Sequence, residues 1–312
     1  MEIDCDCGPE KAKREETFLE KENIFRTRAF IIIEKMVNWC ADPRARLLVD
    51  EVLHSIFFLG KINNPSFSPQ EIISDTELFQ YFEDTFPQPF KVYSYQLPKR
   101  GPFSCVLDMI VHLKGEQNEE VIKENLRAFK NNPRLGKGKH LLSSTVCVSH
   151  TQNGKRYYGV SMSANGKKPV KIIIAASCLS YWDNDVAGAV MTYYPDKTKN
   201  KSFDGTITLP PYVSCQAFTI STGDRKDPCK SCKDLFGLSS EENKEWSYGN
   251  CAEAESLSNL FKNEPTVKEQ LQRKSVRDKD RKNAEESVTV HLLKLLGKPE
   301  FYTPPMPVQK KT

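Results

Sequence analysis

DPCKSC at residues 227–232 and NCAE at residues 250–253 are the stretches around which the predicted fold is organised. Cys229 and Cys251 each stand at the start of a predicted short helix. At a helix N-terminus the helix dipole and the free amides favour the thiolate, which is the form of cysteine that binds a metal. Two cysteines separated by two residues can bind one ion. These helix starts therefore predict a metal site formed by Cys229, Cys232 and Cys251.

Glu253 follows Cys251 by two positions, and at the start of a helix these two residues point in different directions. Cys251 can therefore bind the metal while Glu253 approaches a water on the open side of the metal. A carboxylate in that place can take a proton from the water and later deliver it to a leaving amine. We predict that Glu253 is a catalytic proton shuttle and that Glu255 is a solvated helix residue.

The same cysteines allow other interpretations. The Cys-x-x-Cys spacing also occurs in thioredoxin-like redox sites, and the pair can equally be two unlinked core thiols. If Cys215 supplied a fourth sulfur beside Cys229, Cys232 and Cys251, the site would be a closed structural zinc site with no place for a reactive water. The chain would then be a non-catalytic interaction protein, with its helical N-terminal region as the surface for a protein partner. Without a metal bond, Cys215 is predicted to be a buried thiol in a strand.

A β-hairpin is the clearest local prediction upstream of these cysteines. The runs 143–149 and 156–163 favour β-structure and flank Asn153-Gly154, which is typical of a tight hairpin turn. Three further runs are predicted as strands, at residues 170–176, 206–209 and 212–220. Together with the two cysteine helices, these strands predict an α+β or α/β fold in which a mixed sheet is flanked by helices.

The chain divides into five predicted segments. Residues 1–16 are charged and small and are expected to be a loose N-terminus. Residues 17–100 carry apolar residues at helical spacing, with an N-cap at Asp42 and a capping box at Ser68, and are expected to be helical. The α/β domain is expected over residues 101–265, a charged helical segment over 266–298, and an extended Pro-rich tail over 299–312.

Between residues 140 and 265 the chain resembles the cytidine-deaminase-like superfamily, in particular its divergent nucleobase and nucleic-acid deaminases. The resemblance rests on Pro228-Cys229-x-x-Cys232, on Cys251-Ala252-Glu253 and on the hairpin, with the two cysteine motifs in reversed order. In that family a hairpin leads a three-layer core, and the N-termini of two helices meet at zinc. The resemblance implies that the three cysteines bind zinc with water as the fourth ligand. It also implies that Glu253 moves protons while a nucleobase, free or in nucleic acid, is hydrolytically deaminated. The alternative within this resemblance is an inactive deaminase-derived fold.

The composition is that of a folded protein without a strong charge. Apolar residues make up 38% of the 312, and the formal charge of +4 permits a nucleic-acid partner without requiring one. No apolar run is long enough for a transmembrane helix and the N-terminus has no signal segment, so we expect a cytoplasmic or nuclear protein with no membrane partner. In such a reducing compartment the ten cysteines are expected to be thiols or metal ligands. P-loop, dinucleotide and Gly-x-Ser-x-Gly motifs are absent, which argues against NTPase, Rossmann and serine-hydrolase functions.

Aromatic side chains able to stack on a base are predicted near the cysteines. Trp246 and Tyr248 lie closest in sequence to Cys251 and are the preferred substrate-binding residues, ahead of Tyr157-Tyr158 and Tyr181-Trp182. The lysines around the hairpin are better explained by a solvated loop than by contacts with phosphates. His140 and His150 flank the first hairpin strand and could approach a site.

Overall fold

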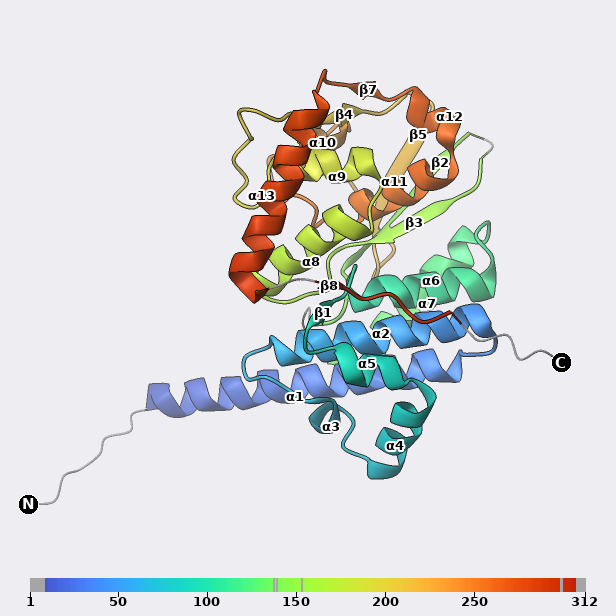
Figure 1. Ribbon diagram of the computed structural model, residues 1–312. Helices are drawn as coiled ribbons and strands as arrows, with labels where there is room; N and C mark the ends of the chain where they lie inside the picture. Colours follow the sequence, from blue (N-terminus) through green and yellow to red (C-terminus); the bar gives the residue numbers. More distant parts are fainter. Residues whose placement is uncertain (1–8, 137, 139, 153, 298–299, 307–312) are drawn as a thin grey trace, which may run out of the picture.

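The computed structural model describes residues 9–136, 138, 140–152, 154–297 and 300–306. The structure combines many helices with small sheets, which confirms the predicted α+β class. Figure 1 shows the first helices at the bottom, a second helical layer above them and the largest sheet above that layer. The bottom layer contains α1 (Pro9–Asn38), α2 (Pro43–Lys61) and α5 (Pro87–Val92), and the second layer contains α6 (Pro102–Lys114) and α7 (Glu119–Lys130). One hydrophobic core connects all of these parts.

Capping signals begin the helices of the first part of the chain. The Asp42 side chain accepts hydrogen bonds from the amides of Arg44 and Ala45 at 2.9 Å, which confirms the predicted N-cap of α2. Ser68 forms the predicted capping box with Glu71. The helix that this box begins, α3 (Pro69–Ile72), is only one turn long, and α4 (Thr76–Thr85) begins separately.

Helices continue beyond residue 100, where the helical N-terminal region was predicted to end. Helices α6 and α7 and a 3₁₀ turn, η1 (Pro133–Leu135), precede the largest sheet. The apolar run 105–113 has no clear period of its own. Pro102 occupies the first turn of α6, and α6 packs against α2, so context makes the run helical.

Both predicted loose ends of the chain need correction where they are described. Helix α1 begins at Pro9, so residues 9–16 are helical; the many Lys, Arg and Glu residues there are good helix formers, and residues 1–8 lie outside the described residues. At the other end, β8 (Glu300–Phe301) pairs in parallel with β1 (Gln96–Leu97). Tyr302 then inserts into the core, where its ring stacks on His54 at 3.8 Å and its hydroxyl donates to Asp50. This anchoring overrides the extended tail predicted from the proline content.

The largest sheet has four strands in the order β3-β2-β5-β6. Strands β2 (Thr145–Thr151) and β3 (Tyr157–Val160) form the predicted hairpin, with Cys147 opposite Gly159. Strand β5 (Val213–Thr219) pairs antiparallel with β2, and β6 (Arg225–Lys226) follows at the edge. The chain therefore passes directly from this sheet into the first cysteine motif.

Helices cover both faces of this sheet. Helix α11 (Ala252–Asn263) packs on one face, and α6 and α7 lie on the other, where the Lys123 ammonium of α7 lies 4.0 Å from the centre of the Phe218 ring. Gly159 allows α11 to approach closely, because a Cβ at this position would lie 2.3 Å from the Ser256 amide nitrogen. The result is the helix–sheet–helix layering that was predicted, with α11 packed closely against the hairpin.

One predicted strand is a helix. Residues 170–176 belong to α8 (Lys167–Ser180), which packs against α9 (Asn184–Met191) and α13 (Asp278–Leu296). The side chains from Ile172 to Cys178 are all buried, so this segment shows a continuous apolar run instead of a helical stripe. A run of this kind does not distinguish a buried strand from a buried helix. Helix α13 lies within residues 266–298, the segment that was predicted to be charged and helical.

The remaining elements are short. Strands β4 (Ile207–Thr208) and β7 (Gln272–Arg273) form a two-stranded sheet, and α12 (Pro265–Glu269) follows α11. None of the helices within the described part of the chain has both the length and the apolar character needed to cross a bilayer.

Candidate metal centre

The two cysteine motifs stand at helix starts, as predicted. Cys229 is the N-cap residue of α10 (Lys230–Phe236), and Cys251 is the N-cap residue of α11; both have extended backbone angles. Gly237 ends α10 in the left-handed conformation, with φ of 67°, which a glycine adopts without strain. The fold thus brings two helix N-termini together from motifs that are separate in the sequence.

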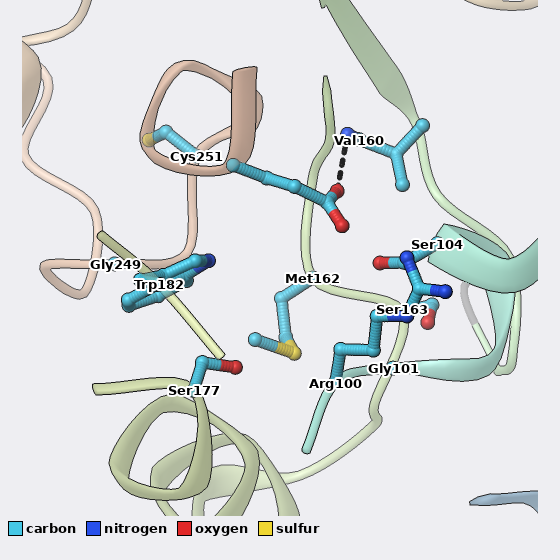
Figure 2. A pocket seen from close by; sticks show the side chains of 11 residues that line it. Arg100, Gly101, Ser104, Val160, Met162, Ser163, Ser177, Trp182, Gly249 and Cys251 are labelled. Atoms are coloured by element: carbon cyan, nitrogen blue, oxygen red, sulfur yellow. Dashed lines mark hydrogen bonds between the residues drawn. The ribbon is translucent and has the colours of Figure 1, made fainter. Parts of the chain in front are cut away.

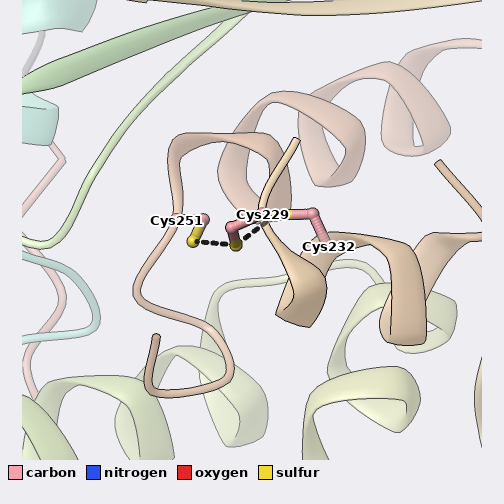
Figure 3. Close-up of side chains that lie close together, drawn as sticks. All are labelled: Cys229, Cys232 and Cys251. Atoms are coloured by element: carbon pink, nitrogen blue, oxygen red, sulfur yellow. Dashed lines mark hydrogen bonds between the residues drawn. The ribbon is translucent and has the colours of Figure 1, made fainter. Parts of the chain in front are cut away.

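The three sulfurs of Cys229, Cys232 and Cys251 form one cluster (Figure 3). The Cys229 sulfur lies 3.7 Å from that of Cys232 and 3.4 Å from that of Cys251, and all three sulfurs lie within 4.8 Å of one another. Zinc–sulfur bonds of about 2.3 Å at tetrahedral angles separate two sulfurs by about 3.8 Å. The cluster can therefore hold a metal ion, and its spacing and all-sulfur donor set fit zinc.

Without a metal, the three cysteines of the cluster differ in their thiol pKa values. Hydrogen bonds from the thiols of Cys232 and Cys251 lower the pKa of Cys229 to about 2, and the amides at the start of α10 add to this effect. The same contacts with Cys229 raise the pKa values of Cys232 and Cys251 well above the usual range. These contacts favour the thiolate at Cys229 and the protonated thiol at Cys232 and Cys251.

This uneven protonation predicts a steep pH dependence of metal binding. Two thiol protons must leave when an ion binds to all three sulfurs, and a higher pH removes the protons that compete with it. We expect the apparent zinc affinity to rise about 100-fold for each pH unit between about pH 6 and pH 8. Competition with a chromophoric chelator at several pH values measures this slope. A slope near zero would contradict binding through these thiols, and a slope of three protons would contradict the ionised state of Cys229.

Glu253 lies beside the sulfur cluster. Its side chain is 4% exposed, and its carboxylate accepts a hydrogen bond from its own backbone amide. Burial raises the pKa of Glu253 to about 7, against the effect of this hydrogen bond. A carboxyl group with this pKa can both accept and release a proton near neutral pH.

Cys215 is not part of the cluster. Among the described residues, the only group of metal-ligating side chains that converge on one point is formed by Cys229, Cys232 and Cys251. The Cys215 sulfur instead lies 3.5 Å from that of Cys147 on the neighbouring strand. The predicted approach of histidines to the site is also not observed, because the ring of His140 hydrogen bonds with Asn165 and that of His150 with the Thr151 carbonyl.

A small pocket adjoins the cluster at Cys251 (Figure 2). Its volume is about 20 Å³, which is room for about one water molecule. Trp182 and Met162 form apolar walls, and the side chains of Arg100, Ser177 and Glu255 add polar ones. Cys251 and Glu255 share this side of α11 because they are four positions apart, whereas Glu253 is not among the lining residues.

Glu255 was predicted to be solvated, and this prediction is wrong. The side chain is 5% exposed and accepts a hydrogen bond from the Val160 amide at 2.8 Å. Burial raises its pKa to about 7, while the positive charge of Arg100 acts in the opposite direction. The cause is the packing of α11 on the hairpin, which turns this side of the helix toward β3.

Arg100 is the centre of a buried polar network behind the pocket. Its guanidinium forms a bidentate ion pair with Glu51 at 2.9 Å and contacts Asp108 at 2.5 Å and the Tyr181 hydroxyl at 2.7 Å. Glu51 belongs to α2 and Asp108 to α6, so this cation joins the lower helical layers to the region of the metal centre.

The aromatic residues preferred from the sequence are engaged in other contacts. The Tyr248 ring stacks on Tyr193 at 4.0 Å, and its hydroxyl donates to Asp234 and Glu245. The backbone of Trp246 exchanges hydrogen bonds with the Ser231 hydroxyl on α10. Both residues thus hold the loop that leads to Cys251. Trp182, which was considered but not preferred, is the aromatic residue in the pocket.

No family model, curated protein or solved structure matches this chain.

Proposed function

We propose that this chain is a zinc-dependent, deaminase-like hydrolase that acts on a nucleobase, either free or in nucleic acid. One observation carries the proposal: the sulfurs at two helix N-termini converge at a spacing that fits zinc, with the buried carboxylate of Glu253 beside the cluster. The donor set is the one implied by the resemblance to cytidine-deaminase-like proteins. The reversed order of the motifs does not prevent it, because only the two helix starts must meet.

The roles of the residues follow from this geometry. Cys229, Cys232 and Cys251 would hold zinc, which as a Lewis acid activates water and polarises the substrate. Glu253 would accept the proton of the attacking water and return it to the departing amine, for which its raised pKa is suited. A nucleobase is larger than the pocket beside Cys251, so its binding would require the pocket to widen.

We also propose that the protein acts in the cytoplasm or the nucleus. Reducing conditions there keep cysteine thiols available to a metal. The described cysteines are free thiols.

Replacement of Glu253 with glutamine tests the catalytic proposal. Glutamine keeps the size and the buried contacts of the side chain but cannot take up the proton. We expect the Glu253→Gln variant to retain zinc and to release ammonia about 10²- to 10⁴-fold more slowly than the unchanged protein. Ammonia release is measured with cytosine- and adenine-containing nucleosides and single-stranded oligonucleotides, and zinc by elemental analysis.

Glu269→Gln is the control for this experiment, because Glu269 is exposed on α12, away from the cluster. This variant is expected to behave like the unchanged protein. If Glu253→Gln released its zinc, or kept full activity, the assigned role would be refuted.

A second candidate function is that of a non-catalytic interaction protein with a structural zinc site. It is favoured by the position of Glu253, which is 4% exposed and does not line the pocket at Cys251. In this case its carboxylate would serve as a buried neighbour of the metal, and the helical N-terminal region would contact a protein partner. Absence of ammonia release from every substrate, combined with stoichiometric zinc, would favour this second candidate.

A further inference from the structure

We infer that Cys147 and Cys215 form a redox-sensitive thiol pair, which hydrogen peroxide converts into a disulfide. The pair is separate from the metal cluster and lies between the sheet and α11. Its sulfurs are 3.5 Å apart, with Cys147 on β2 and Cys215 on β5. This inference does not depend on the proposed function.

The register of the sheet explains why these two sulfurs meet. Cys147 lies opposite Ala217, and Cys215 lies opposite Ser149, so the two cysteines are diagonal neighbours on adjacent antiparallel strands. Both side chains point to the face covered by α11, where they pack with Ala217 and Ala252. A disulfide requires the sulfurs to approach to about 2.05 Å, which is a movement of about 1.5 Å that side-chain rotation and a small strand shift can supply.

The two cysteines differ in exposure, and this difference assigns their roles. Cys215 is partly exposed near the edge of the sheet, whereas Cys147 is fully buried. A solvent-borne oxidant therefore reaches Cys215 first. Burial raises the pKa of Cys147, which favours its protonated thiol. This thiol lies beside the Cys215 sulfur, with which it can form a disulfide.

The chemistry balances with hydrogen peroxide as the only oxidant. The Cys215 thiolate attacks one peroxide oxygen; an S–O bond forms, the O–O bond breaks, and hydroxide leaves and becomes water with the proton that the Cys215 thiol has lost. The product is a sulfenic acid on Cys215. The Cys147 sulfur then attacks the Cys215 sulfur, so that the S–S bond forms and the S–O bond breaks. The hydroxide of the sulfenic acid takes the Cys147 proton and leaves as a second water.

The pair also contacts the helix that carries the metal ligands. Cys147 packs against Ala252, which lies between Cys251 and Glu253 in the first turn of the same helix. A crosslink between β2 and β5 would thus form directly beneath the first turn of α11. Oxidation of this pair would therefore affect the metal centre through the packing of α11 on the sheet, without removing a metal ligand.

Disulfide mapping of the full-length, zinc-loaded protein tests the inference. The protein is treated with a small molar excess of hydrogen peroxide, its remaining thiols are alkylated under denaturing conditions, and the unreduced digest is analysed by mass spectrometry. We expect the peptides of Cys147 and Cys215 to be joined, and dithiothreitol to separate them. Cys105 and Cys178 serve as internal controls, because both are buried outside the two sulfur groups and should remain alkylatable.

Two variants assign the steps. Cys215→Ser should prevent the crosslink and leave Cys147 fully alkylatable. Cys147→Ser should leave a sulfenic acid on Cys215, which dimedone traps. Because Cys215 is partly exposed, its serine variant keeps the test valid even if the buried Cys147→Ser variant fails to fold. The inference is overturned if Cys215 remains a thiol after treatment, or if peroxide joins cysteines of the metal cluster while Cys147 and Cys215 stay reduced.

Discussion

Cys229→Ser is expected to abolish zinc binding, whereas Cys215→Ser is expected to leave it unchanged. Cys229 lies between the other two sulfurs and carries the preformed thiolate, so its loss removes a ligand and the charge that initiates binding. A serine hydroxyl is a poor zinc ligand at neutral pH. Cys215 contacts Cys147 instead of the cluster, and its replacement removes no ligand.

The effect on stability should follow the loss of the metal. An ion that binds only the folded state stabilises it by about 4 kcal/mol when the free ion is present at about 1,000 times its dissociation constant. We therefore expect chelation of zinc to lower the melting temperature of the unchanged protein and of Cys215→Ser, and to leave that of Cys229→Ser unaltered. Elemental analysis and thermal melting with and without a chelator measure both effects. Equal zinc loss in the two variants would instead favour a closed site of four sulfurs.

Arg100→Met is the second substitution with a large expected effect. Arg100 is 5% exposed, and its guanidinium binds the carboxylates of Glu51 and Asp108. Methionine fills similar space but leaves these carboxylates partly buried without their cation. Breaking a buried ion pair from one side costs about 3–5 kcal/mol. We expect chemical denaturation at pH 8 to show a loss of this size.

The pH dependence of this loss gives a sharper test. Burial raises the pKa of Glu255 to about 7, and the charge of Arg100 limits that increase. The pKa of Glu255 is higher in the folded state than in the unfolded state. Its contribution to the free energy of unfolding is therefore most favourable at low pH, where the carboxyl is protonated, and is lost as the pH rises through the folded-state pKa. Removal of Arg100 raises this pKa further, so the destabilisation by Arg100→Met should be larger at pH 8 than at pH 5.

Arg277→Ala provides the comparison for this substitution, because Arg277 forms its ion pair with Asp280 on the exposed surface. Its replacement should not change stability measurably at either pH. If Arg100→Met changed the free energy of unfolding as little as Arg277→Ala, the Arg100 network would not hold the helical layers together.

The sequence predicted the elements whose signals are local. Asp42 and Ser68 cap their helices through residues two or three positions away. Gly154 of the predicted turn lies in the connection between two paired strands, and Asn153 lies outside the described residues. The starts of α10 and α11 could also be predicted from the sequence, since Cys229 and Cys251 precede short amphipathic runs. The convergence of their sulfurs was a correct inference from residue types known to share a metal.

The remaining features depend on contacts that are distant in the sequence. The middle of α8 is buried on all sides from Ile172 to Cys178, so the predicted strand at residues 170–176 carries no periodic signal. Glu255 is buried only because Gly159 allows α11 to lie against β3, and no local pattern distinguishes it from a solvated glutamate. Trp182 lines the pocket and Trp246 does not, because the turn after α8 places Trp182 beside Cys251. This packing cannot be predicted from the local sequence.

Zinc K-edge X-ray absorption of the purified, zinc-loaded protein tests most directly whether the two helix N-termini share one ion. We predict three sulfur neighbours at about 2.3 Å and one lighter oxygen or nitrogen neighbour at about 2.0 Å, with one zinc per chain. A first shell of four sulfurs, a shell with fewer than three, or a protein that binds no zinc would contradict a site formed by Cys229, Cys232 and Cys251.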